Sequence, residues 1–256
     1  MSSIYRYLTF GLREDWLDSF LVQDDFLINN CLGPIQYKAF VSYLKDMKLI
    51  SKTKETTELG KDIKKGLFSS RLNKQAIWSI LWINLVFSSS LFLWWTNFKN
   101  ASYSKKCLID KLSENFGTKS VRSKINAYNA LVSTLERTPI GDLLKQGKVI
   151  KKGRERIVIK EGNPDVPFLA ICYNLYKFAE YHKKYEFNLE EIENMTLSPQ
   201  KVFSMDTKKV ENILKQKLHN EIIQVSLSEE KPLIILNKNL SSLNMLSILI
   251  GGNHEI

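Results

Sequence analysis

One uncharged stretch, from Gln75 to Phe98, constrains the fold of this chain more than any other feature of its sequence. It includes four of the five tryptophans in the chain, and it is long enough to cross a bilayer. Asn84, the serine triplet 88–90 and Asn97 interrupt it, however, and an interfacial aromatic belt would place tryptophans only at the two ends. We therefore expect two short helices buried as a Trp-rich helical core, with no membrane association.

Positive charge is concentrated in one segment. The 256 residues have a formal net charge of +10. Residues 103–160 hold 14 Lys and Arg against 5 Asp and Glu, a surplus of nine, whereas residues 161–256 hold 10 against 13, a net charge of −3. A surplus confined to about sixty residues is typical of a module that binds nucleic acid. The expected partner of this segment is double-stranded DNA.

The order of signals in the basic segment predicts two helices. Ser104 is a suitable N-cap for the first helix, and Thr118 for a second that runs to Leu135. An apolar stripe predicts the buried face of the second helix: Val121, Ile125, Tyr128, Leu131, Val132 and Leu135. Polar side chains suited to phosphates and base edges are predicted on its exposed side: Lys119, Arg122, Ser123 and Asn126.

A β-hairpin is predicted after the second helix. Gly153 lies between two β-rich runs, 149–152 and 156–160, and a glycine at such a point favours a tight turn. Four cations surround the predicted tip and could lie along a phosphate backbone: Lys151, Lys152, Arg154 and Arg156. With the helices before it, the hairpin is typical of a winged-helix-like unit.

A less basic unit of the same kind is predicted upstream. Gly33 and Pro34 open a helix, because proline tolerates the first helical position. A short strand is expected from Leu49, and Thr57 leads into another helix. Two exposed side chains of the first of these helices are further candidates for DNA contact: Gln36 and Lys38.

The remaining third of the chain is slightly acidic. Its apolar spacing predicts an amphipathic helix from Lys209 to Val225, followed by a strand at 233–236. Acidity disfavours contact with phosphates and favours docking to a partner protein. The expected fold is thus mainly α with small β-hairpins, with two or three winged-helix-like units around the Trp-rich core, and the expected units are 1–70, 71–102, 103–162 and 163–256.

Signals for catalysis are weak, and we expect a protein that is not an enzyme and needs no cofactor. His182, His219 and His254 are isolated, which disfavours a zinc site. No phosphate-binding glycine motif is present. Acidic groups at 24–25 and 190–193 leave open a metal-dependent nuclease. Three distant cysteines and an N-terminus without a secretory pattern favour a reducing, cytoplasmic location.

Several motifs resemble those of a known family, and together they span most of the chain. They are residues 12–17, 32–50, 57–60, 76–98 and 118–135. In order and spacing they are similar to the bacterial domain-of-unknown-function family numbered four thousand and seven. Its members are encoded beside cysteine desulfurases and enzymes resembling phosphoadenosine phosphosulfate reductase, in islands of DNA sulfur modification (phosphorothioation) and phage defence. The resemblance implies a DNA-binding accessory subunit with one of those enzymes as protein partner, or alternatively a scaffold that recruits a sulfur-transfer enzyme.

Overall fold

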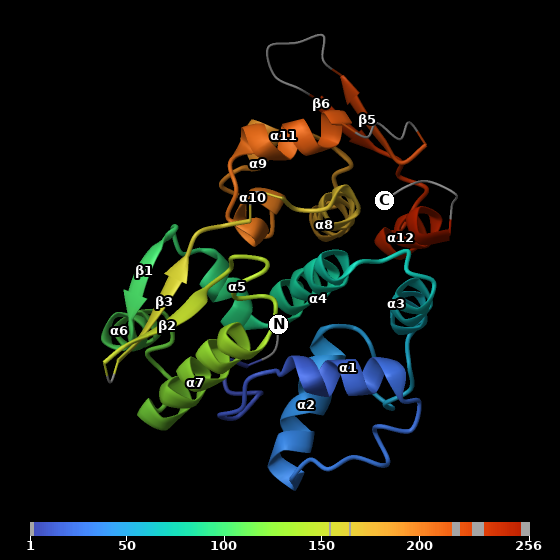
Figure 1. Ribbon diagram of the computed structural model, residues 1–256. Coiled ribbons are helices and arrows are strands. Elements are labelled where there is room, and N and C mark those ends of the chain that lie inside the picture. The colour runs from blue at the N-terminus through green and yellow to red at the C-terminus, as the bar shows by residue number, and fades with distance from the viewer. Residues whose placement is uncertain (1–2, 154, 164, 217–220, 227–232, 252–256) are drawn as a thin grey trace.

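The chain folds mainly into α-helices with two small antiparallel sheets (Figure 1). A computed structural model describes residues 3–153, 155–163, 165–216, 221–226 and 233–251. The expectation of a mainly α fold with small β-hairpins is confirmed. Over the described ranges, no helix has both the length and the apolar character needed to span a membrane.

The Trp-rich stretch forms two consecutive helices, α4 (Lys74–Ser88) and α5 (Ser90–Thr96). Asn73 caps α4, since its Oδ1 accepts a hydrogen bond from the N–H of Ala76 at 2.8 Å. Every α4 residue from 76 to 86 is buried. The predicted pair of buried helices is therefore confirmed, and in Figure 1 this pair lies at the centre of the molecule.

Three helices precede the central pair: α1 (Glu14–Val22), α2 (Pro34–Asp46) and α3 (Glu58–Phe68). As predicted, α2 begins at Pro34, and Thr57 caps α3 by accepting from the N–H of Gly60 at 3.1 Å. The short strand predicted from Leu49 was wrong in extent, because a single bridge between Ile50 and Thr56 forms there. Residues 51–55 form the turn between them, where Ser51 N–H donates to the Glu55 carbonyl at 2.8 Å. Because Thr57 then caps α3, the chain leaves the strand directly after Thr56.

We call residues 101–160 the basic module. Its elements are β1 (Ala101–Ser104), α6 (Lys105–Asn115), α7 (Val121–Arg137), β2 (Lys148–Lys152) and β3 (Glu155–Lys160). Ser104 caps α6 as predicted, accepting from the N–H of Cys107 at 3.2 Å. The sheet has the order β1-β3-β2, so the last strand lies in the middle. Helices α6 and α7 pack against each other beside this sheet.

We call residues 168–251 the C-terminal unit. Its elements are α8 (Phe168–His182), β4 (Glu186–Asn188), α9 (Leu189–Ile192), α10 (Pro199–Phe203), α11 (Thr207–Gln216), β5 (Ile223–Ser226), β6 (Leu233–Leu236) and α12 (Ser242–Gly251). The sheet has the order β4-β6-β5. The helix predicted to reach Val225 was wrong at its end, because residues 223–226 form β5. Their alternating side chains pair with β6, and this pairing overrides the helical spacing. The strand predicted at 233–236 is confirmed.

One hydrophobic cluster runs through all of these parts. Polar contacts within it join distant elements: the Tyr43 hydroxyl on α2 lies 3.0 Å from Thr134 Oγ1 on α7, and that same oxygen accepts from the N–H of Leu12. Gly11 packs directly on α7, where a Cβ would lie 2.3 Å from the backbone nitrogen of Thr134. The basic module is therefore fixed against the N-terminal helices. The division of the chain at 70, 102 and 162 stays a prediction.

Candidate nucleic-acid interface

The start of α7 places the first group of predicted contact residues. Ser120 caps the helix, since its Oγ accepts from the N–H of Ser123 at 3.1 Å. The prediction of Thr118 as the cap was wrong by two residues, because residues 118–120 complete the turn out of α6. Lys119 and Arg122 are exposed, and Ser123 and Asn126 are half-buried. Both cations therefore face solvent at the helix start, where backbone N–H groups also attract anions.

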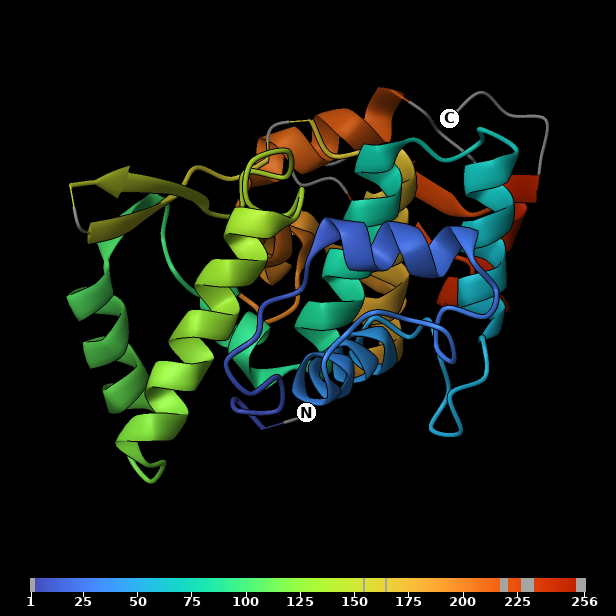
Figure 2. The ribbon, with the colours of Figure 1, turned by 60° about the horizontal axis from the view of Figure 1, so that its bottom comes forward.

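The buried face of α7 is shorter than predicted. Val121 is 70% exposed and Ile125 is 39% exposed, whereas the stripe from 127 to 135 is buried. Figure 2 shows the reason, because the first turns of α7 extend beyond the rest of the fold beside α6. The placement of Val121 and Ile125 in the core was therefore wrong, and two apolar side chains lie among the exposed cations.

The hairpin of β2 and β3 carries the second group. Lys151 and Lys152 are exposed at the end of β2. Gly153 has φ +62° at the turn, a left-handed conformation that glycine adopts without strain. Lys151 lies opposite Arg156 across the ladder. Arg154 falls outside the described residues.

Arg156 belongs to a cluster centred on Tyr128. Its guanidinium lies 3.4 Å from the carboxylate of Glu136, and the Lys105 ammonium lies 5.7 Å from the ring of Tyr128. The Tyr128 hydroxyl is buried and, among the described residues, makes no hydrogen bond. Burial raises the pKa of this phenol. Cations from α6 and β3 thus converge on one face of α7, although Glu136 offsets part of the Arg156 charge.

The two predicted groups lie at different corners of the module. Arg122 and Glu136 are separated by most of α7, about 21 Å at 1.5 Å per residue. Arg156 contacts the Glu136 end, and Figure 2 places the hairpin tip well away from the start of α7. This spacing is less than one turn of B-DNA, roughly 34 Å. One duplex is therefore long enough to touch both corners.

The candidates from α2 do not join this surface. The Oε1 of Gln36 accepts from the N–H of Gly33 at 3.2 Å, so this side chain completes the start of α2. Lys38 is exposed on the same helix. Neither side chain forms a hydrogen bond or ion pair with the basic module in the part of the chain that the structure describes.

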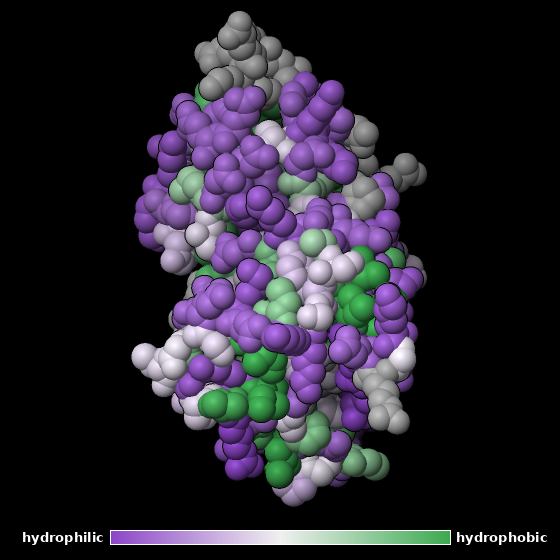
Figure 3. Space-filling view, turned by 90° about the vertical axis from the view of Figure 1, so that its left-hand side faces the viewer, coloured by the Kyte–Doolittle hydropathy of each residue, from purple (hydrophilic) through white to green (hydrophobic). Residues whose placement is uncertain are grey.

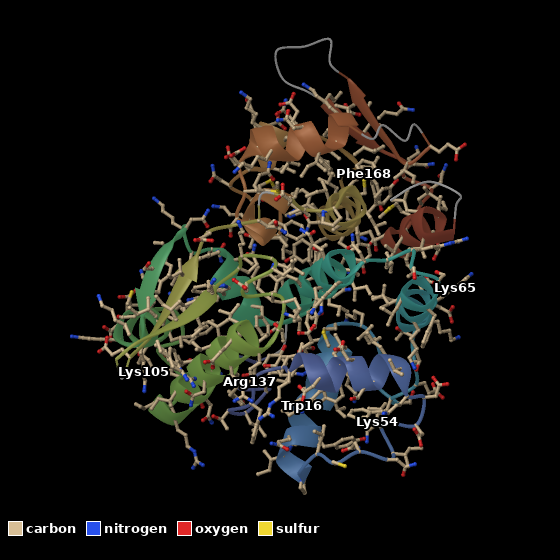
Figure 4. All side chains as sticks on the ribbon, viewed as in Figure 1. Trp16, Lys54, Lys65, Lys105, Arg137 and Phe168 are labelled. Atoms are coloured by element: carbon tan, nitrogen blue, oxygen red, sulfur yellow. The ribbon has the colours of Figure 1, made fainter. Side chains whose placement is uncertain are left out.

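Among the described residues, five further exposed cations of the module were not among the predicted contacts: Lys105, Lys106, Arg137, Lys145 and Lys148. All are exposed, and Figure 4 shows Lys105 at the outer edge of the module and Arg137 at the end of α7. The sequence signal that could have identified them is their position in the charge-rich segment 103–160. The face in Figure 3, which looks onto this side of the molecule, is largely hydrophilic with small separate apolar patches.

One cation of the segment is buried. Lys160, at the end of β3, is 1% exposed. Its Nζ donates to the carbonyl oxygens of Trp95 at 3.1 Å, Thr96 at 3.2 Å and Phe98 at 2.8 Å. Burial, followed by the nearby charge of Lys201, lowers its pKa to about 7. Lys160 therefore closes the C-terminal end of α5 and cannot touch a phosphate at the surface.

The acidic groups considered for a nuclease do not gather. Asp24 pairs with Lys64 at 2.9 Å, and Asp25 accepts from Asn29 at 2.8 Å. Glu191 lies 3.8 Å from Lys184. Within the described ranges, no group of three or more His, Cys, Asp or Glu side chains is placed to hold a metal ion.

Comparison with known proteins gives one kind of match. No family model matches the chain, and no curated protein does. Among solved structures, it is similar to a magnesium ion-bound crystal structure of SspB, with a TM-score of 0.73 at 12% identity over 98% of this chain and 87% of that one. A second SspB crystal structure gives 0.72 at 14% identity with the same coverage. The chain therefore shares its fold with SspB along nearly its whole length.

Proposed function

We propose that this protein is a DNA-binding accessory subunit of a DNA sulfur-modification or phage-defence system, and that it contacts phosphates through α7 and the β2–β3 hairpin. The observation that carries the DNA contact is the localised charge: exposed cations gather on one module at the start of α7, on α6 and on the hairpin. The system is proposed from the family resemblance of the motifs described above.

The arrangement of the basic module supports a winged-helix interpretation. From α5 onward the order is helix, strand, two helices and a hairpin, with the final strand in the middle of the sheet. In such a unit the second of the paired helices borders the major groove, and the hairpin reaches along the backbone. Here those elements are α7 and the turn at Gly153, and both carry exposed cations.

A phosphate-directed interface makes binding sensitive to salt. Each neutralised phosphate releases a condensed counterion, so a protein that makes about six such contacts loses roughly a thousandfold in affinity between 50 and 200 mM salt. Ser123 and Asn126 are the uncharged candidates on α7 for bonds to base edges, and both are half-buried. Sequence preference should consequently be modest.

The test is a salt titration of binding to a short duplex DNA, with a charge-reversed variant of both corners, K119E/R122E/K151E/K152E. We expect salt-sensitive binding by the native protein and a loss of at least a hundredfold in the variant at low salt. Thermal unfolding would verify that the variant keeps its fold.

The control is K208E/K238E in the C-terminal unit, which reverses two charges where the test variant reverses four. Both lysines are exposed, and neither forms a salt bridge in the described part of the chain. After allowance for its smaller change in net charge, we expect the affinity of this control for the duplex to change no more than threefold. Equal losses in the two variants, or weak and salt-insensitive binding by the native protein, would overturn the proposal.

A scaffold that recruits a sulfur-transfer enzyme is the second candidate. The observation that favours it is the C-terminal unit, which repeats the strand order of the basic module in a segment with a net charge of −3. A scaffold would keep its protein partner in the variant of the basic module and lose nothing else. Copurification with a desulfurase or a reductase-like enzyme, compared between the native protein and that variant, separates the two roles.

A further inference from the structure

Two aliphatic side chains are exposed side by side in the first turns of α7. Val121 is 70% exposed and Ile125 is 39% exposed, whereas the apolar residues farther along the helix, from 127 to 135, are buried. A spacing of four residues places two side chains on one face of a helix, with Cβ atoms about 5–6 Å apart. Val121 and Ile125 therefore form one apolar surface, which we call the α7 tip.

The surroundings of the α7 tip set it apart from other exposed apolar side chains. Folded proteins expose many apolar residues singly, so exposure by itself does not indicate a ligand. The α7 tip, however, belongs to the most basic segment of the chain, and Figure 2 shows that this end of α7 extends beyond the rest of the fold. A ligand that carries negative charge can therefore approach it without obstruction.

Cations flank the α7 tip on both sides. At about 100° per residue, Arg122 lies to one side of the apolar pair and Lys124 to the other. Neither side chain forms a hydrogen bond or a salt bridge within the described ranges. The major groove of B-DNA, which is about 12 Å wide, presents base edges between two phosphate backbones. An apolar surface between two available cations is complementary to that arrangement.

The α7 tip also lies on the side of α7 that the hairpin contacts. Glu136 follows Ile125 by eleven residues, which is about three turns at 3.6 residues per turn, so the two side chains lie on nearly the same side of the helix. Arg156 of the hairpin lies 3.4 Å from Glu136. A duplex placed along this side of α7 can therefore meet both the hairpin and the α7 tip.

One base offers an apolar group in the major groove. Thymine carries a methyl group at C5, and aliphatic side chains contact it, although they cannot bond to phosphates or to the polar groups of base edges. The distance of about 5–6 Å between the two side chains is a little less than two base-pair steps of roughly 3.4 Å each. The α7 tip is thus suited to methyl groups on thymines one or two steps apart.

We propose that Val121 and Ile125 give this protein a preference for thymine, through contact with C5 methyl groups in the major groove. This inference rests on the proposed binding of DNA through α7, and it adds a base preference to that binding. Arg122 and Lys124 hold the helix between the two backbones, while the α7 tip distinguishes one base from the others.

The test is a fluorescence titration of the full chain with two short duplexes built only of A·T pairs. One contains thymine, and the other contains deoxyuridine at every thymine position. Deoxyuridine keeps the phosphates and the base-pairing groups and lacks only the C5 methyl. Because two methyl groups leave water on binding, we expect the thymine duplex to bind roughly tenfold more tightly.

The variant V121A/I125A should bind the two duplexes with equal affinity. Alanine favours the helix more than valine or isoleucine does, and thermal unfolding would verify that the fold is kept. The matched control is V22A/I28A, which makes the same two substitutions outside the basic module, where Val22 is 61% and Ile28 is 84% exposed. This control should keep the tenfold preference.

A methylated G·C duplex provides an independent measurement. Replacing cytosine by 5-methylcytosine adds a methyl group at C5 in the major groove without altering the base pair. We expect the native protein to bind the methylated duplex more tightly than the unmethylated one, and V121A/I125A to bind them equally.

Equal affinity of the native protein for the thymine and deoxyuridine duplexes would overturn the inference. So would the same preference in V121A/I125A, because it would then arise from the shape of the duplex. If V121A/I125A lost a copurified protein while the native protein bound both duplexes equally, the α7 tip would be assigned to a protein partner instead. Weak, salt-insensitive binding of every duplex would overturn the proposed DNA binding itself, so the two failures are recognised separately.

Discussion

In both the basic module and the C-terminal unit, a helix leads into a strand, helices follow, and a final pair of strands completes a sheet whose last strand lies in the middle. The two regions differ in charge: residues 103–160 carry a surplus of nine positive charges, whereas residues 161–256 have a net charge of −3. Topology alone therefore does not determine the partner of such a unit, because the partner is recognised by the exposed side chains.

The ends of the two middle strands differ as well. β3 ends in the buried Lys160, whose Nζ closes α5, whereas β6 ends in the buried Leu236. Helix α8 ends instead through Lys183 in the left-handed conformation, with φ +56°. The same helix-to-sheet junction is thus built once with a buried cation and once with backbone geometry. The buried cation makes the junction at α5 sensitive to pH, whereas the described junction at α8 contains no such buried cation at its helix end.

The largest effect is expected at the glycine that joins the two regions. G162A introduces a Cβ 2.0 Å from the Ser204 carbonyl at φ +80°, and we expect a loss of about 4 kcal/mol in the free energy of unfolding. G153A at the hairpin turn meets no neighbour within 4 Å, so only its φ of +62° matters and about 1 kcal/mol is expected. Urea unfolding of both variants measures the difference. Similar losses would mean that the two regions are not held together through this contact.

The next effect is the pH dependence of stability. The pKa of Lys160 is lowered to about 7, below its usual 10.5, so the unfolded chain binds more protons between these values and stability rises with pH across that window. From pH 7 to pH 9 we expect Lys160 to contribute a rise of about 2 kcal/mol. K160M should remove that rise, as measured by urea unfolding at each pH.

Lys177 in α8 provides the comparison for this experiment. Burial lowers its pKa too, so both regions contribute a rise of the same sign. If K160M and K177M each remove part of the rise in the free energy of unfolding with pH, one contribution is assigned to each region. An unchanged profile in K160M would show that its ammonium does not titrate in this window.

The smallest effect concerns the ion pair beside the proposed DNA surface. E136Q frees the guanidinium of Arg156, which lies 3.4 Å from Glu136, and we expect duplex affinity to rise about threefold at low salt. E211Q is the matched change in the C-terminal unit, because Glu211 pairs with Lys215 on α11. Fluorescence titration with labelled duplex compares the two. A rise in both, or in neither, would remove the distinction between the regions.

Local signals predicted much of this fold. The starts of α2 and α6, the cap of α3, the turn at Gly153 and the burial of the Trp-rich stretch each depend on residues close in sequence. Those features follow from capping and turn geometry and from apolar content.

Features that depend on distant contacts were missed. Lys160 looked like one more cation of a basic strand, but its burial follows from the position of three carbonyls at the end of α5. Val121 continues the apolar spacing of α7, yet no element covers it. One pocket is lined by residues 96–100, 161–163 and 200–209, the first and last of which are more than a hundred residues apart, and no spacing within the sequence indicates such a meeting.

The central helices also give this protein a built-in optical reporter. The indole of Trp82 donates to Val202 in the C-terminal unit at 2.8 Å, and that of Trp95 donates to Gln146 in the basic module at 2.7 Å. Both indoles are fully buried. In a variant whose single remaining tryptophan is Trp82 or Trp95, the emission would shift when the region bonded to that indole opens to water. Two such chains would reveal whether the regions separate from the centre one after the other or at the same instant.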